Sequence, residues 1–393
     1  MVRVPGCRGA WSRVACGLDY PEQVVSKENE GIAQLESGPR KVPVKTDGTK
    51  CESTEAKNMK VRNIAVVTAI FLNTIATASW AQETGESEQS EKTIINVAGH
   101  EVPVMKGGLY DRYRSNPPLS VVAAESPETD LSWFKTLEKT KVDIGFESYS
   151  PNFYYENSRV TAIYTADLDR LRQLMPAEVL EQVRPLKIWP GRGLIALTAY
   201  AYHYCDNDSY NEIAISIITN KPGGSNLGPI TLLSQIRAKS FWGYVLKLPV
   251  NTELARVRGV VGYNLPKWLT EINYRDEDES LTFEITDSET GKVDVVFGGK
   301  KLADVSTDVA MVTNSFTNID HEGSLTYGYA VSRQLRHASS TSDDAVTLTL
   351  SDGSLSNYIK SLNLGSLVKY EYVPNFQSAL YAPKPLSTLL ESD

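Results

Sequence analysis

The sequence predicts a mainly β fold, an antiparallel β-barrel or curled sheet with two or three flanking helices, over residues 144–385. Short runs that alternate apolar and polar residues, as half-buried strands do, outnumber helical runs. Few consecutive strands are joined by a helix long enough for a parallel β-α-β unit. With 41% hydrophobic and 9% aromatic residues, the 393-residue chain has enough apolar side chains for a globular core.

Strands are expected wherever such a run is bounded by turn residues. They are 158–165, 184–189, 194–204, 210–219, 241–248, 267–274, 281–286, 292–297, 307–319, 324–335, 345–350 and 367–373. Asp167 is expected to cap a helix over 168–175 that Pro176 ends, and a second helix around 229–239 has proline in its first turn.

A third helix is expected to begin at Asn251, a fair N-cap, and to stop at Gly262, a fair C′ residue. Pro266 then prevents the helix from resuming. The alternation over 267–274 predicts a half-buried strand that begins at Lys267. On the strand 210–219, Ile213, Ile215 and Ile217 form a bulky apolar face, whereas the face with Glu212 has mostly small residues and suits a cavity wall.

The first 81 residues are expected to lie outside the domain. Residues 1–58 show no structural period and are interpreted as an unstructured extension upstream of the true initiator, Met59. A basic start, the apolar run 64–75 and a small-residue end predict a secretory signal peptide over 59–81. The alternative is a membrane anchor, or an internal signal anchor if Met1 is the start, but the run is short for a span. Residues 82–143 are expected to form an acidic lead-in and an extended arm that packs on the main domain or on a neighbouring subunit.

The signal peptide predicts export to the periplasm or the medium. Of the four cysteines only Cys205 follows the cleavage site, so the mature chain has no intramolecular disulfide, and Cys205 is expected to be a small buried hydrophobe. Residues 1–81 hold 11 basic and 8 acidic residues, so the mature chain is more acidic than the formal charge of −8 of the whole chain. This acidity argues against nucleic acid and against stable membrane association after cleavage.

Three segments carry the functional signal. Residues 259–268 comprise a glycine, a short apolar run and a turn ending in Pro-Lys at Lys267. Tyr210-Asn211-Glu212 opens one strand, and Asn157-Ser158-Arg159 opens another just ahead of the Asp167 helix. In order and spacing they resemble the acetoacetate decarboxylase family, with its signature around a Schiff-base lysine, its Tyr-x-Glu segment and its Asn-x-Arg strand.

The resemblance is partial near the lysine. Leu265 replaces the usual aromatic residue, Val260-Val261 replaces a usual Arg-Glu pair, and Trp268 replaces the second lysine. An amine attacks a carbonyl only when unprotonated, and an ordinary pKa of about 10.4 leaves one lysine in a few thousand neutral at pH 7. Such a lysine must be desolvated or lie beside another cation, as in acetoacetate decarboxylase itself. Because Trp268 occupies the neighbouring position, burial or a nearby arginine would have to favour the unprotonated amine of Lys267.

The resemblance implies an enzyme, a carboxy-lyase that condenses Lys267 with a small β-keto acid and releases CO₂. It implies that Glu212 positions substrate or relays a proton and that Arg159 orients Glu212. It also implies a homo-oligomer and no cofactor or metal, because the lysine imine is itself the electron sink.

Other interpretations remain open. Trp268 could flatten the pocket wall for a Schiff-base aldolase or dehydratase acting on a larger keto acid, or the fold could be a non-catalytic small-molecule binding protein. Lys267 could be a solvated edge lysine, and Glu212 and Arg159 could each close a surface pair worth under about 1 kcal/mol. The four histidines, His100, His203, His321 and His337, lack the spacing of a metal site.

Overall fold

The computed structural model describes residues 91–391. The predicted extension 1–58, the predicted signal peptide 59–81 and the first residues of the lead-in lie outside the described residues. The described residues form one compact unit. Within the described part, no helix has the length and apolar character needed to cross a membrane.

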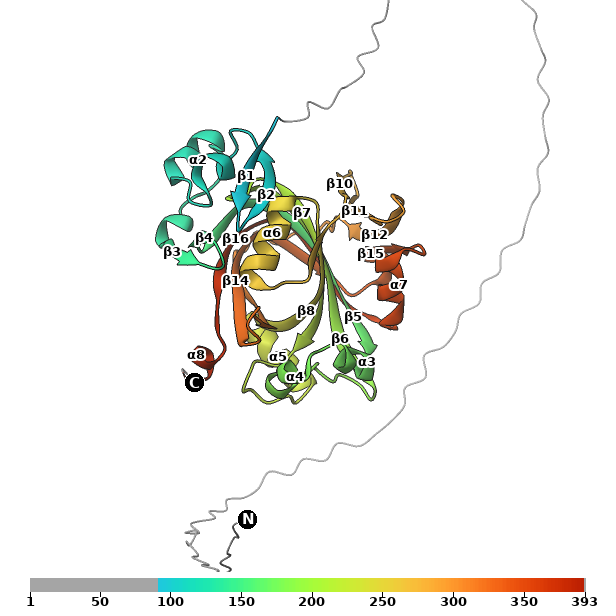
Figure 1. Cartoon of the computed structure of the whole chain (residues 1–393). Helices are drawn as coiled ribbons and strands as arrows, with labels where there is room; N and C mark the ends of the chain where they lie inside the picture. Colours follow the sequence, from blue (N-terminus) through green and yellow to red (C-terminus); the bar gives the residue numbers. More distant parts are fainter. Residues whose placement is uncertain (1–90, 392–393) are drawn as a thin grey trace, which may run out of the picture. The chain divides into compact units, whose positions relative to one another are not determined.

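A closed seven-stranded barrel organises this unit (Figure 1). The strands run in the order β13-β14-β16-β5-β6-β7-β8, and all neighbours within this order are antiparallel. Parallel pairing of β13 with β8, from Thr313 opposite Ser240 to Phe316 opposite Gly243, closes the barrel. The mainly β, largely antiparallel prediction is therefore confirmed. The strands are β5 (Asn152–Asp167), β6 (Arg192–Cys205), β7 (Tyr210–Thr219), β8 (Ser240–Val250), β13 (Ala310–Ile319), β14 (Leu325–Ser340) and β16 (Leu367–Pro385).

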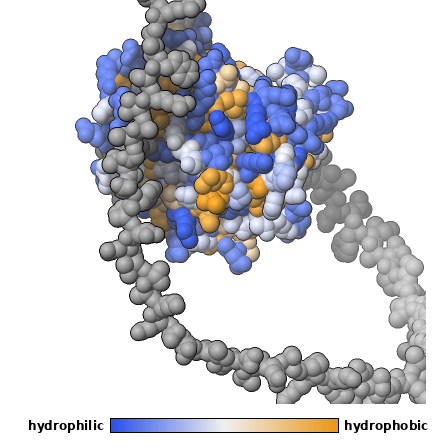
Figure 2. All heavy atoms as spheres, turned by 90° about the horizontal axis from the view of Figure 1, so that it is seen from below, coloured by the Kyte–Doolittle hydropathy of each residue, from blue (hydrophilic) through white to orange (hydrophobic). Residues whose placement is uncertain are grey.

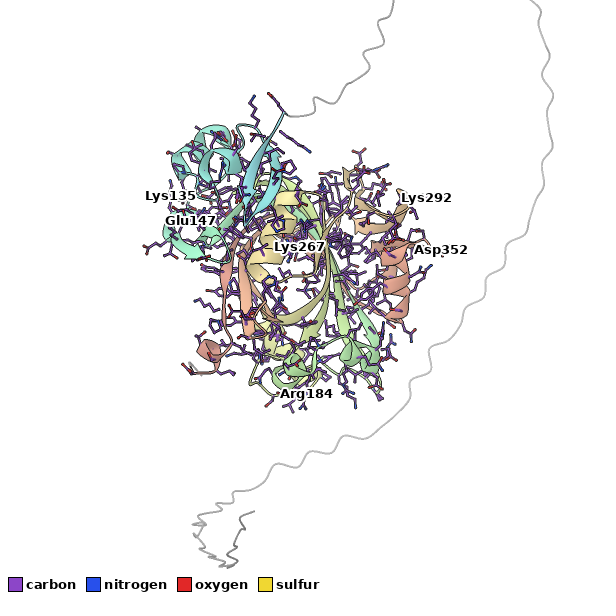
Figure 3. The ribbon with its side chains drawn as sticks, in the orientation of Figure 1. Lys135, Glu147, Arg184, Lys267, Lys292 and Asp352 are labelled. Carbon is purple, nitrogen blue, oxygen red and sulfur yellow. The ribbon has the colours of Figure 1, made fainter. Side chains whose placement is uncertain are left out.

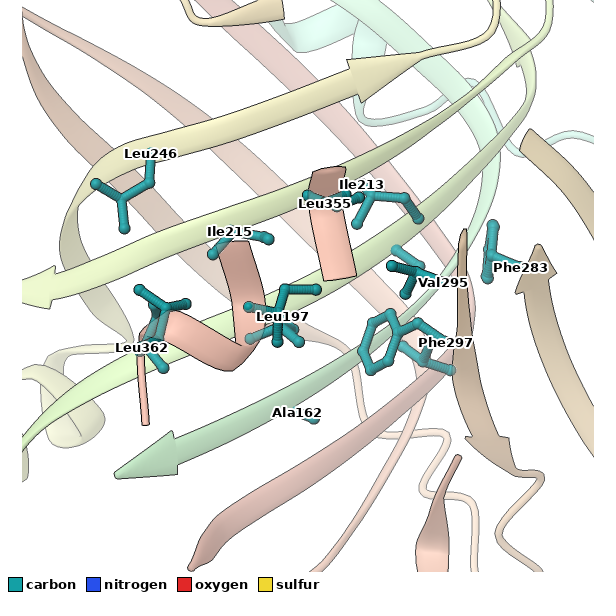
Figure 4. Packing of buried hydrophobic residues seen from close by; sticks show 14 of the residues in the cluster. Ala162, Leu197, Ile213, Ile215, Leu246, Phe283, Val295, Phe297, Leu355 and Leu362 are labelled. Atoms are coloured by element: carbon teal, nitrogen blue, oxygen red, sulfur yellow. The ribbon is translucent and has the colours of Figure 1, made fainter. Parts of the chain in front are cut away.

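A second, four-stranded sheet lies outside the barrel. Its order is β10 (Ile272–Asp276), β11 (Ser280–Thr286), β12 (Val293–Lys300) and β15 (Val346–Leu350). The main core fills the space between the two sheets: Ile213 and Ile215 of the barrel face Phe283 and Phe297 of the second sheet, beside α7 (Ser354–Ser361) (Figure 4). The predicted bulky face of β7 is thus the core face, which leaves Glu212 on the barrel's inner side.

The segment before the barrel packs on the same unit. It contains β1 (Lys92–Val97), β2 (His100–Met105), α1 (Leu109–Tyr113), α2 (Leu119–Glu125), the 3-10 turn η1 (Phe134–Thr136), β3 (Thr140–Asp143) and β4 (Glu147–Ser150). Val102 and Tyr110 pack with Leu254 of α6, and Phe134 packs with Phe153 and Tyr155 of β5. The arm therefore covers the end of the barrel that holds Glu212.

Shorter helices lie at the opposite end of the barrel (Figure 1). They are α3 (Leu168–Gln173), α4 (Ala177–Gln182) and α5 (Pro229–Ala238); α8 (Ser387–Leu390) follows β16, and the 3-10 turn η2 (Asp343–Ala345) precedes β15. Asp167 caps α3 as predicted, accepting a 2.7 Å hydrogen bond from the Arg170 N–H. The predicted strand 184–189 is wrong: Pro185 lies within this stretch and Pro190 follows it, and its only strand-like pairing other than a turn bridge at Trp189 is Pro185 with Thr219.

The segment around Lys267 differs from its prediction in two ways. Helix α6 (Glu253–Tyr263) is capped by Thr252 rather than Asn251, and it continues through Gly262 until Asn264 adopts the left-handed conformation. The predicted strand 267–274 is two strands in different sheets, since β9 (Lys267–Leu269) pairs in parallel with β8 and β10 belongs to the second sheet. A period of two continues across such a break, so the sequence did not reveal it.

Helix α7, which the sequence did not predict, is capped by a carboxylate from another element. Asp294 of β12 accepts hydrogen bonds from the backbone N–H groups of Leu355 and Ser356 and from the Ser351 hydroxyl. Burial raises the pKa of Asp294, but hydrogen bonds, chiefly from Ser356, outweigh it and hold this pKa below its ordinary value. The charged carboxylate is thus the form that stabilises the fold.

We expect Asp294→Asn to lower the free energy of unfolding by about 1–2 kcal/mol at neutral pH, because an amide caps two N–H groups less well than a carboxylate. A folded pKa below the unfolded value of about 3.9 gives stability that is present above that value and is lost as the pH falls through the folded pKa. Urea unfolding at pH 7 and at acidic pH measures this. The difference between wild type and variant should shrink in acid, and a constant difference would contradict the assignment.

Candidate active site

Lys267 lies in the interior beneath α6, whereas the other charged residues labelled in Figure 3 lie at the periphery. Its ammonium donates a 2.6 Å hydrogen bond to Glu212 Oε2, and the two side chains are only 8% and 10% exposed. The structure therefore brings together two of the three predicted site residues, which lie far apart in the sequence. The interpretation of Lys267 as a solvated edge lysine is wrong.

A glycine on α6 makes room for this lysine. A Cβ atom at Gly259 would lie 2.3 Å from Cδ and 2.4 Å from Cε of Lys267, distances that no pair of carbon atoms tolerates without displacement. The first glycine of the motif thus leaves room for the lysine stem, which would have to shift from its position against the helix backbone if this residue carried a Cβ atom.

We expect Gly259→Ala to push the Lys267 amine away from Glu212 and to abolish lysine-dependent chemistry, although alanine favours the helix by about 1 kcal/mol. Gly262→Ala is the matched control, because on the same helix its new methyl group meets Ile144 instead. Activity and thermal unfolding of both variants check this. Equal activity in the two would show that the close approach at Gly259 is unimportant.

Tyrosines surround the ion pair on the barrel side. Tyr202 donates a 3.4 Å hydrogen bond to Glu212 Oε1, the hydroxyls of Tyr154 and Tyr210 are 3.1 Å apart, and the Lys267 ammonium lies 5.8 Å from the Tyr210 ring centroid. Burial raises the pKa of all three tyrosines well above the ordinary value. All three are therefore neutral, and Tyr202 is the one that donates to Glu212.

Arg159 lies in the same cross-strand row but does not orient Glu212 directly. Along the barrel wall Arg159 is opposite Tyr200, and Tyr200 is opposite Glu212, so two strand spacings separate the arginine from the carboxylate. Arg159 forms its ion pair with Glu371 at 3.4 Å. Arg159 was predicted to orient Glu212, but no hydrogen bond joins the two in the described residues, and the Tyr202 hydroxyl donates to the carboxylate instead.

The second cation near the lysine is Arg258, which the sequence motifs did not indicate. It is 5% exposed, and its guanidinium donates hydrogen bonds to Tyr110, Ser148 and Asn152 at 3.1–3.3 Å. All three partners are neutral, and no carboxylate within residues 91–391 forms an ion pair with it. Its spacing was a usable signal, because Arg258 is four residues from both Leu254 and Gly262 on the buried face of α6.

Lys267 and Arg258 line one small cavity. Its volume is about 30 Å³, room for one or two water molecules. The Nδ2 atom of Asn152, another lining residue, is buried without a hydrogen-bond partner. The other lining residues are Tyr154, Asn207, Tyr210, Ala255, Gly259, Tyr263, Leu265 and Leu380. Hydrogen-bond donors and positive charge dominate this set, which suits an anionic, acceptor-rich ligand.

Trp268 does not line this cavity. Successive strand residues point to opposite sides, and Trp268 packs against the main core while Lys247 lies 5.8 Å from its ring centroid. The expectation that Trp268 flattens the pocket wall is therefore wrong. The identity of residue 268 does not affect the amine through direct contact.

The remaining chemistry-bearing residues lie elsewhere. Cys205 is fully buried and unpaired, the small hydrophobe that was predicted, and its thiol donates to the Asp208 carbonyl. Among the described residues, no group of three or more His, Cys, Asp or Glu side chains is arranged to hold a metal ion.

The fold and site define a β-barrel protein with a buried lysine–carboxylate pair and an unpaired arginine in one cavity. No known family's sequence profile matches the chain, and no curated protein matches it in sequence. Some solved structures match the chain in fold, each at low sequence identity. They include an acetoacetate decarboxylase (14% identity, 60% of this chain and 88% of that chain, TM-score 0.40), the Legionella pneumophila acetoacetate decarboxylase (10%, 60% and 86%, 0.42) and the enduracididine biosynthesis enzyme MppR complexed with pyruvate (14%, 60% and 91%, 0.43).

Proposed function

We propose that this chain is an enzyme that binds a small keto acid as an imine on Lys267, with decarboxylation of a β-keto acid as its reaction. The observation that carries the proposal is the cavity in which Lys267, paired with Glu212, lies beside the otherwise unneutralised Arg258. A buried cation without a carboxylate partner favours an anionic ligand, since the ligand then supplies the missing charge.

The residues have separate tasks in this reaction. Glu212 accepts a proton from the Lys267 ammonium, and the free amine attacks the ketone and forms the imine with loss of water. The protonated imine takes up the electron pair of the breaking C–C bond as CO₂ leaves. The resulting enamine is protonated at carbon, and water hydrolyses the imine to release the ketone and regenerate the amine.

The substrate carboxylate is assigned to Arg258 and Asn152. Arg258 supplies a guanidinium whose existing partners are neutral, and the Asn152 amide supplies the unused N–H donors. A cavity of about 30 Å³ is smaller than any keto acid, so it has to enlarge on binding. When the Lys267 nitrogen bonds to the ketone carbon of the substrate, its ion pair with Glu212 breaks, and this separation is part of the enlargement.

We expect Arg258→Met to raise KM for the keto acid about tenfold to a hundredfold, because a hydrogen bond to a charged group is worth about 1.5–3 kcal/mol. Arg256→Met is the matched control on the same helix, since Arg256 pairs with Glu253 outside the cavity. Steady-state kinetics compares the two, with thermal unfolding to show that both variants fold. Equal KM values would remove Arg258 from the proposed site.

The function is tested by incubating the protein with acetoacetate and with pyruvate in D₂O, while recording CO₂ release and deuterium incorporation by NMR. Decarboxylation predicts CO₂ and deuterated acetone from acetoacetate. Deuterium exchange into pyruvate without CO₂ release from acetoacetate would point to an aldolase or dehydratase. If neither reaction occurs while the keto acid still binds, the chain is a binding protein.

A further inference from the structure

Helix α5, at the end of the barrel opposite the site, exposes its apolar side chains and buries a polar one. Ile230, Leu233 and Ile236 are 66%, 53% and 49% exposed. Gln235 is 7% exposed and hydrogen-bonds to the Thr219 carbonyl and the Trp242 N–H. Residues three apart share a broad side of a helix, so the three aliphatic chains form one outward face.

Two neighbouring side chains extend this face. Leu227, just before α5, is 61% exposed, and Trp189 is 63% exposed. The loop that ends at Trp189 runs beside the start of α5, because the Asn226 amide donates to the Arg184 and Pro185 carbonyls. Figure 2 views the described part from below and shows hydrophobic atoms gathered near the middle, with strongly hydrophilic ones beside them.

The ionisable side chains in the two loops and the helix of this face are all basic. Residues 183–192 and 220–239 contain no Asp or Glu; they contain Arg184, Lys187, Arg192, Lys221, Arg237 and Lys239. The acidic residues between the two segments, Asp206, Asp208 and Glu212, lie at the far ends of β6 and β7. Of the basic residues, Arg184, Lys187, Arg237 and Lys239 are exposed, and none of these four has an ion pair within the described range. This local charge is opposite to the formal charge of −8 of the chain.

We propose that the face made of Trp189, Leu227, Ile230, Leu233 and Ile236, with the basic side chains of its two loops and of α5, docks on an anionic lipid bilayer. Protruding aliphatic and tryptophan side chains enter the boundary between headgroups and acyl chains, and nearby lysines and arginines meet the anionic headgroups. Symmetric contact with a second copy is disfavoured, because it places the same basic residues against each other. The expectation of no membrane association considered net charge alone, whereas docking depends on the local distribution.

The test uses the chain from Glu83 onward, which contains the compact unit of residues 91–391 and lacks the apolar run 64–75. Co-sedimentation with vesicles of phosphatidylcholine plus phosphatidylglycerol is compared with vesicles of phosphatidylcholine alone, at low and high salt. We expect binding to the anionic vesicles that weakens with salt. Ile230→Ser/Leu233→Ser should weaken it at least about tenfold, and Arg237→Gln/Lys239→Gln also at least about tenfold, given roughly fivefold per charge.

Matched controls come from exposed residues elsewhere. Ile94→Ser removes an aliphatic chain that is 60% exposed on β1, and Lys292→Gln removes an exposed charge before β12; both should bind as wild type does. Absence of binding, or equal binding by all variants, overturns the proposal. So does a concentration-dependent dimer in sedimentation velocity that Ile230→Ser/Leu233→Ser dissociates without any vesicle binding. None of these readouts depends on the reaction proposed for Lys267.

Discussion

Lys267→Arg should lose at least about 10³-fold in turnover of the keto acid, because arginine keeps the positive charge beside Glu212 but cannot form an imine. Because arginine can keep the buried ion pair with Glu212, the loss of turnover reports on imine formation and not on loss of this pair. Turnover is followed by loss of acetoacetate and by CO₂ release, and thermal unfolding confirms that the variant folds.

Lys247→Arg is the control for this substitution. Lys247 lies on the neighbouring strand β8, but its ammonium faces the rings of Trp268 and Tyr358, away from the cavity. It should keep wild-type turnover. Retention of turnover by Lys267→Arg would remove the imine from the mechanism, whatever the control does.

Glu212→Gln is expected to lower stability as well as rate. Removal of one partner from a buried ion pair leaves the other charge uncompensated, which costs about 3–5 kcal/mol of unfolding free energy. Loss of the proton acceptor should slow turnover by about 10²–10⁴-fold. Urea unfolding and steady-state kinetics measure the two effects separately.

A double-mutant cycle shows whether the pair is coupled as the geometry implies. Lys267→Met should also destabilise the protein, whereas Glu212→Gln combined with Lys267→Met should be more stable than the sum of the single effects predicts. Simple additivity would mean that the two side chains are hydrated separately in solution. The 2.6 Å contact would then have no energetic consequence.

The sequence predicted those elements whose signals are local. The Asp167 cap, the strands 281–286 and 292–297 and the two faces of β7 each follow from a few adjacent residues. The pairing of Lys267 with Glu212 followed from a family resemblance carried by short motifs, and the contact between them is now observed.

Long-range features could not be obtained in this way. Closure of the barrel depends on a parallel pairing between β8 and β13, which neither strand indicates alone. Asn152, at the start of β5, and Arg258 of α6 meet at the cavity although they lie 106 residues apart in the chain. Trp268 was expected at the pocket wall because it follows Lys267 in the chain, but adjacent residues of a strand face opposite sides.

The account depends most on an imine at Lys267, and reductive trapping tests it most directly. The protein is incubated with acetoacetate or pyruvate, treated with borohydride and analysed by peptide mass spectrometry. The account predicts a keto-acid-dependent adduct on Lys267, absent from Lys247 and from the Lys267→Arg variant. If Lys267 stays unmodified with both acetoacetate and pyruvate, or if the adduct forms only on surface lysines, the account is contradicted.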